Sequence, residues 1–430
     1  MKSERQRDLM EHVLNLKCLI CGKTYQPHEV DYVCPEHGDE GILDVQYDYE
    51  LIDRRLSQGD LLHSTDYTIW RYKPLLPVKA GAAVPPLGVG WTPLYRTSRL
   101  AADLGLKHLW VKDDGRLPTA SFKDRASALA LVKAQEKQAR IITTASTGNA
   151  AAALSGLCAS VRQPNLIFVP ESAPPAKIAQ LLVFGSTVIL VKGSYDEAFE
   201  LCLQACKRYG WYNRNTGYNP YMTEGKKTAS YEICEQLGWK APDRIFVSVG
   251  DGCIIGGLHK GLKDLQALGW ITHMPKLMGI QAEGSAYLFQ AWQENADVLT
   301  KPPIVAHTVA DSISAGLPRD RLKAMAAVKE TGGAYLSLTD PEILAAIPAL
   351  ARGCGVFAEP AGAAAYAGLL KAVNQGLVAA DERIVVLNTG NGLKDVASAL
   401  KAVELVGDYP HLIAPTMDDL NRVLADIGQK

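Results

Sequence analysis

The chain has 430 residues, with 45 Lys and Arg against 46 Asp and Glu, so its formal net charge is −1. At roughly 100–200 residues per domain, this length predicts two or three structural units. The balanced charge excludes the basic surface that a nucleic-acid-binding protein needs, so we expect no nucleic-acid partner. The sequence has no run of about 18 or more uncharged apolar residues and no apolar core near its N-terminus, so we expect neither a membrane span nor secretion. We therefore expect a cytoplasmic protein whose nine cysteines are reduced thiols or metal ligands.

The first 50 residues contain a short pattern of potential metal ligands. Cys18 and Cys21 enclose two residues, twelve residues follow, and Cys34 and His37 again enclose two residues. Two such pairs of soft ligands give a closed tetrahedral site, which is structural rather than catalytic. We therefore predict a zinc-ribbon-like segment at 1–50 with a structural zinc ion on these four side chains. The alternatives are a loop without metal, or a zinc-ribbon interaction protein with no catalytic role.

Residues 51–90 are predicted to form an arm or linker that ends in the Gly- and Pro-rich stretch AGAAVPPLGVG. From residue 91 on, short apolar runs alternate with helix-length amphipathic stretches. Several runs are apolar almost throughout, which is typical of strands buried on both faces. The alternation predicts an open parallel α/β sheet, whose ligands bind outside the carboxyl ends of its strands. The predicted strands lie at 108–112, 139–145, 165–170, 186–191, 243–250, 276–282 and 383–390.

One lysine opens a predicted helix. Lys123 stands in the segment PTASFKDR at 118–125, where Ser121 or Asp124 can cap the helix. An amine is a nucleophile only when it is deprotonated, so a covalent role requires burial or a nearby cation to lower its pKa. Arg125 and the helix N-terminus are the candidates for that effect. The alternative is an ordinary solvent-exposed lysine at a helix start.

The segment TTASTGNA at 143–150 includes the last residues of the strand predicted at 139–145 and precedes a helix of small residues. Backbone N–H groups at such a helix start bind anions, and the hydroxyls of Ser146 and Thr147, beside Gly148, add donors, so a substrate carboxylate is a suitable guest. Asn149 can donate and accept hydrogen bonds in one plane, which suits an aromatic hydroxyl. The alternative is an ordinary cap on a buried helix.

Two glycine-rich turns follow later strands. The first, VGDGCIIGG at 249–257, opens a helix, and its glycines allow the backbone to approach a phosphate closely. Asp251 is unfavourable beside a phosphate unless it points away or meets a cation. The second, NTGNGLKD at 388–395, contains Thr389, whose hydroxyl can bond a pyridine nitrogen without fully protonating it. Each turn alone is also compatible with a plain strand-to-helix connection.

Together these segments resemble the fold-type II pyridoxal-phosphate enzymes, the tryptophan synthase β family. PTASFKDR is similar to the PxGSFKDR lysine motif, STGNAAAA to the SxGNxxxA carboxylate loop, and VGDGCIIGG to the glycine-rich phosphate loop. FAEPAGAAAYAGL at 357–369 and NTGNGLKD resemble the C-terminal signatures. Within the family the chain looks most like the threonine synthases, through GWTPLYR at 90–96 and NPYMTEGKKTASYEI at 219–233. The resemblance runs in matching order from about residue 88 to about residue 405.

The resemblance implies a role for each motif. Lys123, the catalytic residue, would hold pyridoxal 5'-phosphate as a Schiff base and move protons. Phe122 would lie near the ring, Asn149 at the phenolic oxygen and Thr389 at the pyridine nitrogen. The remaining cofactor-binding residues would be Gly250, Asp251, Gly252, Cys253 and Ile254, and those that bind a small amino-acid substrate would be Ser146, Thr147, Gly148 and Asn149.

The resemblance also implies a lyase reaction, the conversion of O-phosphohomoserine and water to threonine and phosphate. Two segments depart from the threonine synthase pattern. Where NPxRxEGQKT has an arginine for the substrate phosphate, this chain has Met222, so another cation is needed. The candidates are Lys226, Lys227, Arg214 and Arg319. The glycine turn is closer to the loop of serine and threonine dehydratases, so the alternatives are a dehydratase or ammonia-lyase (an α,β-elimination) and a β-replacement synthase.

The resemblance finally implies two open parallel α/β domains with the cofactor between them. We expect the larger, cofactor-binding domain at 91–125 and 226–405, the smaller domain at 126–225 and a less regular tail at 406–430. We also expect a homodimer, because dimers are the commonest soluble oligomers.

Overall fold

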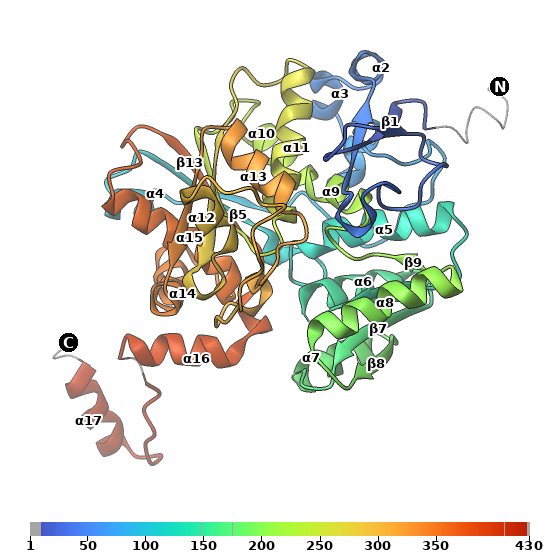
Figure 1. The fold of residues 1–430 in the computed structure, drawn as a ribbon. Helices are drawn as coiled ribbons and strands as arrows, with labels where there is room; N and C mark the ends of the chain where they lie inside the picture. The colour runs from blue at the N-terminus through green and yellow to red at the C-terminus, as the bar shows by residue number, and fades with distance from the viewer. Residues whose placement is uncertain (1–9, 147, 174, 408, 428–430) are drawn as a thin grey trace.

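The computed structural model describes residues 10–146, 148–173, 175–407 and 409–427. Figure 1 shows two sheets with helices packed around them, and a small N-terminal sheet beside the helices of the larger one. A strand is present in each of the seven predicted ranges, which confirms the predicted alternation of strands and helices. Within these described ranges, no helix combines the length and the apolar composition that crossing a bilayer requires.

The larger sheet has the strand order β12–β11–β10–β13–β5–β4. All neighbouring strands are parallel except the edge strand β4, which runs antiparallel to β5. Along β13, Val385 and Leu387 pack into one hydrophobic cluster while Ile384 and Val386 pack into the other, so the strand is buried on both faces. The strands are β4 (Leu94–Arg96), β5 (His108–Asp113), β10 (Arg244–Ser248), β11 (Lys276–Ala282), β12 (Ala334–Leu338) and β13 (Arg383–Asn388).

Helices cover both faces of this sheet. One face packs against α5 (Lys123–Glu136), α9 (Tyr221–Lys226), α10 (Thr228–Gln236), α11 (Cys253–Ala267), α12 (Tyr287–Gln293) and α13 (Arg321–Glu330). The other face packs against α4 (Ser98–Asp103), α14 (Asp340–Cys354), α15 (Pro360–Asn374) and α16 (Val396–Leu405). Helix α14 shows how the sequence sets such bounds, since it begins at a capping box of Thr339 and Glu342 and ends at Gly355, whose φ is +77°.

The smaller sheet is parallel throughout, with the strand order β8–β7–β6–β9. Its strands are β6 (Ile142–Ala145), β7 (Asn165–Pro170), β8 (Thr187–Val191) and β9 (Tyr212–Asn213), and its helices are α6 (Asn149–Ser160), α7 (Pro175–Val183) and α8 (Tyr195–Tyr209). Helix α5 packs against both α6 and α9, so it joins the two parallel layers.

The N-terminal sheet is antiparallel and lies against α9 and α11. Strand β1 (Val13–Cys18) pairs with β2 (Thr24–Tyr25) and β3 (Leu43–Tyr47). The Tyr47 hydroxyl donates to Glu224 of α9 at 2.5 Å, and Lys260 of α11 donates to Asp44 at 2.9 Å, so buried polar contacts hold the sheet in place. The connecting segment contains the helices α2 (Tyr49–Asp53) and α3 (Gln58–Leu62) and the 3₁₀ helix η2 (Ile69–Leu75).

Some elements were not predicted. Strands β4 and β9 are only three and two residues long, and β12 has the mixed sequence AYLSL, so none of them gives a clear apolar run. The C-terminal tail, expected to be less regular, contains the helix α17 (Met417–Ile427), which lies apart from the other helices in Figure 1. The domain boundaries drawn from the sequence stay a prediction.

Candidate active site

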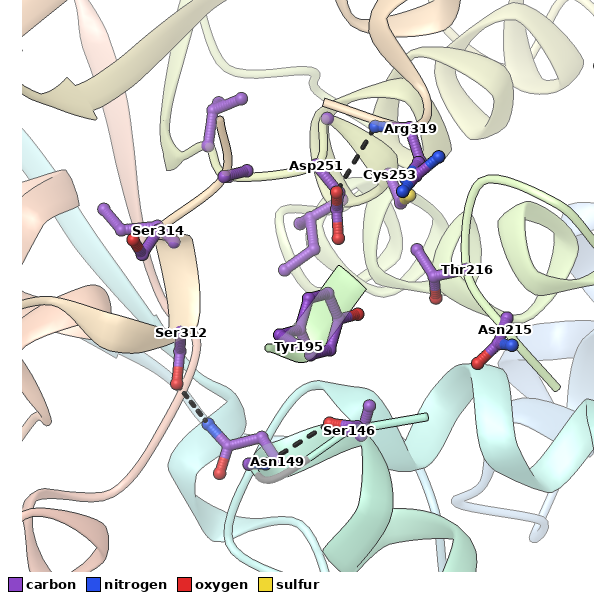
Figure 2. A pocket seen from close by; sticks show the side chains of 18 of the residues that line it. Ser146, Asn149, Tyr195, Asn215, Thr216, Asp251, Cys253, Ser312, Ser314 and Arg319 are labelled. Atoms are coloured by element: carbon purple, nitrogen blue, oxygen red, sulfur yellow. Dashed lines mark hydrogen bonds between the residues drawn. The ribbon is translucent and has the colours of Figure 1, made fainter. Parts of the chain in front are cut away.

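A cavity of about 540 Å³ lies between the carboxyl ends of β6 and β10, where a parallel α/β fold is expected to bind its ligand. Its wall includes Lys123 at the start of α5, Ser146 after β6, the turn at 250–254, and the loop at 311–317. Figure 2 shows Ser146 and Asn149 on one side of the cavity and Asp251, Cys253 and Arg319 on the other. The structure thus brings together segments that are more than 100 residues apart in the sequence.

Lys123 is the first residue of α5, and the end of β13 fixes its position. The N–H of the fully buried Phe122 donates to the Thr389 carbonyl at 2.9 Å, and Ser121 forms a bridge with Gly390. Burial is the main cause that lowers the pKa of Lys123, and the charge of Arg214 adds to it. The amine therefore has the protonation behaviour that a covalent role requires.

Arg125 is not the main cation that lowers the pKa of Lys123, which corrects the expectation from the sequence. Its guanidinium is fully buried outside the cavity wall and pairs with Asp114 at 2.6 Å and with Glu232 at 2.5 Å. These two carboxylates compensate its charge, so the cation that acts on Lys123 is Arg214 instead.

The loop between β6 and α6 leaves a helix start open to the cavity. Gly148 precedes Asn149, the first residue of α6, and none of the described side chains caps this helix. The Gly148 N–H donates to Ser146 Oγ at 3.3 Å. Thr147, predicted with these residues, lies outside the described residues. Uncapped N–H groups beside a serine hydroxyl form a suitable site for a carboxylate.

The side chain of Asn149 already has partners. Its amide donates to Glu359 Oε1 at 2.7 Å and to Ser312 Oγ at 3.3 Å. Burial raises the pKa of Glu359 to about 7. A cofactor phenolic oxygen at Asn149 would therefore have to replace the weaker contact with Ser312.

The glycine turn after β10 is shaped for close approach of an anion. Gly252 has φ of +89°, and a Cβ at Gly250 would lie 2.7 Å from the Cα of Ile313, so neither position tolerates a side chain easily. Helix α11 begins at Cys253 without a side-chain cap, so its first N–H groups are free for a ligand. The Asp251 carboxylate accepts a hydrogen bond from the N–H of Arg319 at 3.3 Å, which reduces its repulsion of an anion (Figure 2).

The residues expected around the cofactor ring differ in exposure to the cavity. Phe122 and Thr389 are buried and do not belong to the described cavity wall. Ser248, at the end of β10, does belong to it, and its hydroxyl lies 3.5 Å from the Thr389 hydroxyl. Ser248 was not predicted from the sequence, although a serine next to the glycine turn was a usable signal.

Other wall residues had no clear signal in the sequence. Tyr195 comes from the start of α8 and Ser312 from the 3₁₀ helix η5 (Asp311–Ile313), and only the fold brings them to the cavity (Figure 2). Of the four cations proposed from the sequence, Arg214, Lys226 and Arg319 line the cavity, whereas Lys227 does not.

The four N-terminal metal-ligand candidates converge in space. Ligand atoms of Cys18, Cys21, Cys34 and His37 all lie within 4.8 Å of one another. His37 Nδ1 is 3.5 Å from the Cys34 sulfur and 3.9 Å from the Cys18 sulfur, and the sulfurs of Cys21 and Cys34 are 4.0 Å apart. Three thiols and one imidazole at these spacings fit a tetrahedral metal site.

Comparison with known proteins identifies the family. Residues 86–390 match the family described as pyridoxal-phosphate dependent enzyme. The chain belongs to this family. It is 39% identical to a threonine synthase of Methanocaldococcus jannaschii over 96% of this chain and 99% of the relative, and 39% identical to one of Methanosarcina acetivorans over 91% and 94%. The family, the cofactor and the class of threonine synthase-like lyase predicted from the motifs are therefore confirmed.

Solved structures of this family share the fold. Threonine deaminase isoform 2 from Solanum lycopersicum matches with a TM-score of 0.64 at 23% identity, covering 74% of this chain and 83% of that one. Diaminopropionate ammonia lyase from Escherichia coli matches with a TM-score of 0.63 at 17% identity, covering 79% and 93%. These likenesses confirm the predicted fold-type II architecture.

The residues of the cavity fit pyridoxal phosphate. The cavity offers an amine with a lowered pKa at Lys123 and an uncapped helix start at Cys253 for a phosphate. The turn in front of that helix start leaves no room for a side chain at Gly252, because a Cβ there would lie 2.6 Å from the Cβ of Ala324. The fit thus rests on features that a plain strand-to-helix connection does not need.

Proposed function

We propose that this enzyme converts O-phosphohomoserine and water to threonine and phosphate. The observation that carries the proposal is the extent of the match to the threonine synthase of Methanocaldococcus jannaschii, 96% of this chain and 99% of the relative. The deaminase and ammonia-lyase structures match at 23% and 17% identity, a level that supports a common fold only. A replacement reaction is therefore favoured over an elimination.

In this proposal Lys123 holds the cofactor and moves a proton at the Cα of the substrate. Pyridoxal phosphate, when bound, supplies an electron sink next to the substrate amine. Because burial lowers the pKa of Lys123, more of its Nζ is present as the free base that proton transfer requires.

The other residues predicted from the sequence bind and orient. The N–H groups of the turn from Gly250 to Ile254 would hold the cofactor phosphate, and Thr389, supported by Ser248, would lie near the pyridine nitrogen. Phe122 is fully buried, and the hydrogen bond from its N–H to the Thr389 carbonyl holds the backbone next to the lysine. Ser146, Gly148 and Asn149, together with Thr147, would bind the substrate carboxylate.

The test offers purified, cofactor-loaded enzyme O-phosphohomoserine and, separately, L-threonine and L-serine. Released phosphate, new threonine and 2-keto acid are measured in the same samples. We expect phosphate and threonine in equal amounts and little keto acid. Keto acid formed without phosphate turnover would refute the proposal and identify an eliminating lyase.

We also propose that Cys18, Cys21, Cys34 and His37 hold a structural zinc ion. The support is the convergence of one imidazole and three thiols within 4.8 Å, a donor set that zinc prefers. Elemental analysis should find about one zinc per chain, and the variant Cys34→Ser should lose most of it. Metal content that is unchanged in this variant would argue against the site.

The proposal includes a homodimer in the cytoplasm. All nine cysteines are free thiols in the structure, which suits a reducing compartment. Light scattering of the purified enzyme should give about twice the mass of 46.5 kDa, and the monomer mass would refute the dimer.

A further inference from the structure

Two cations in the cavity lack a counter-charge. Arg214 and Lys226 are fully buried and line the cavity, and among the described residues neither forms an ion pair with a carboxylate. Arg214 donates from Nε to Ser127 at 3.0 Å and from Nη1 to Thr216 Oγ1 at 3.1 Å, while its Nη2 has no hydrogen-bond partner. Lys226 Nζ donates to the same Thr216 oxygen at 3.2 Å. Two positive charges thus converge on one neutral hydroxyl.

The other two cations named from the sequence are compensated. Lys227 lies 2.6 Å from Glu224 and 2.7 Å from Asp264, outside the cavity wall. Arg319 lies 3.4 Å from Asp196, and its guanidinium is 4.6 Å from the centre of the Phe199 ring. Among these four cations, only Arg214 and Lys226 therefore lack a carboxylate partner in the described part of the chain.

An anion that joins such a pair of charges relieves the cost of burying them. Burial of an unpaired charge is unfavourable, and it lowers the pKa of Lys226 to about 8 and that of Arg214 to about 10. A phosphate monoester carries up to two negative charges and several acceptor oxygens. It can accept from the free Nη2 of Arg214 and from Lys226 together, as guanidinium and ammonium groups commonly bind phosphate.

The position favours a phosphate on the substrate over that of the cofactor. The cofactor phosphate has a complement of its own in the uncapped N–H groups of α11. Thr216 follows Asn215, whose Oδ1 accepts hydrogen bonds from Thr144 Oγ1 at 2.7 Å and from the Ala145 N–H at 2.9 Å. Asn215 thereby places the cation pair next to the end of β6, which leads directly to Ser146 and the proposed carboxylate loop.

We propose that Arg214, Lys226 and Thr216 form the subsite for the phosphate group of the substrate, in place of the arginine that the threonine synthase pattern has at Met222. This inference rests on the proposed function. Met222 itself is buried and does not belong to the described cavity wall. When the Cγ–O bond of O-phosphohomoserine breaks, its electron pair leaves with the phosphate, and the two cations hold the inorganic phosphate that results.

The test compares the variants Arg214→Gln and Lys226→Gln with the charge-preserving Lys226→Arg. Lys263→Gln serves as the control, because it removes an exposed cation that lies outside the cavity wall, 3.7 Å from Glu330. Cofactor loading is read from the absorbance of bound pyridoxal phosphate, and binding of inorganic phosphate to the holoenzyme is measured by calorimetry. The kcat/KM for O-phosphohomoserine is measured in parallel.

We expect both glutamine variants to load cofactor as the parent does, but to bind inorganic phosphate about 10- to 100-fold more weakly, since each loses a charge-assisted hydrogen bond. The kcat/KM should fall by a similar factor, Lys226→Arg should recover most of the loss, and Lys263→Gln should stay within about 3-fold of the parent. If Arg214→Gln does not fold, the two Lys226 variants decide the question.

Two results would overturn the inference. One is phosphate binding that the glutamine variants leave unchanged, and the other is loss of cofactor loading with phosphate binding retained, which would assign the cations to the cofactor. The proposed function can fail separately. If the parent enzyme binds phosphate through these cations but makes no threonine, the phosphate subsite is supported and the proposed reaction is refuted.

Discussion

The variant Glu232→Gln should destabilise the protein by about 3–5 kcal/mol at pH 7, the usual cost of breaking a buried ion pair. Glu232 is fully buried and accepts from Arg125 at 2.5 and 2.8 Å and from Lys112 at 2.7 Å. The cluster contains two cations, Arg125 and Lys112, and two carboxylates, Asp114 and Glu232. Glutamine keeps the shape but leaves the two buried cations with one carboxylate.

The pKa of Glu232 gives a second measure of the same energy. Burial alone would raise this pKa, but the charges of Arg125 and Lys112 outweigh it and lower the pKa to about 2, against an ordinary value of 4.5. This difference corresponds to about 3 kcal/mol in favour of the charged form. Because the folded-state pKa is the lower one, this stabilisation is present above pH 4.5 and is lost as the pH falls toward 2.

Urea unfolding followed by tryptophan fluorescence measures the effect as a shift of the midpoint. The control Glu294→Gln removes a carboxylate that is half exposed and lies 2.9 Å from Lys301, and it should change stability by less than about 1 kcal/mol. The difference between Glu232→Gln and the parent should be constant from pH 8 to pH 5 and should shrink below pH 4.5. A loss under about 1 kcal/mol at pH 7, or a difference that grows in acid, would refute the reasoning.

Three further predictions concern the sites. Lys123→Ala should lower kcat/KM by at least about 1,000-fold, because it removes the group that holds the cofactor and moves the proton, while near-parental urea unfolding would show that the fold is intact. Binding of inorganic phosphate should weaken as the pH rises through about 8, because Lys226 then loses its proton, and calorimetry at pH 7 and pH 9 would detect this. The titratable and charged groups that face Lys226 include Lys123, Arg214, Asp251, Cys253 and Asp320. Removal of zinc by a chelator should lower the thermal unfolding midpoint of the protein, and Cys34→Ser should make that midpoint insensitive to the chelator.

The elements that carry the site followed from local patterns in the sequence. Apolar runs marked β6, β10 and β13, and glycine or small polar residues marked the turns after them, because buried parallel strands and tight strand-to-helix turns restrict residue type at each position. The lysine motif around Lys123 and the glycine turn near Gly252 could also be read from the sequence, so their resemblance to a family was visible without coordinates. Short elements such as β9 were not predicted, because two residues give no periodicity.

Pairing in three dimensions was decided only by the fold. The sequence named Lys226 and Lys227 as equal candidates, but their side chains diverge: Lys227 meets Glu224 and Asp264, and Lys226 meets the cavity. Likewise Arg125, two residues after Lys123, was the obvious cation for lowering the pKa of that amine, yet Arg214 has this effect.

The physical reason is the range of the forces involved. Backbone geometry and the burial of apolar side chains act over a few neighbouring residues, so the sequence determined the strands, the turns and the family of this protein. The charge state of Lys226 depends on every group that packs around it, and those groups come from α5, α11, the residue after β9 and the residue before α13. Only the tertiary structure could decide which cations of the cavity lack a carboxylate partner.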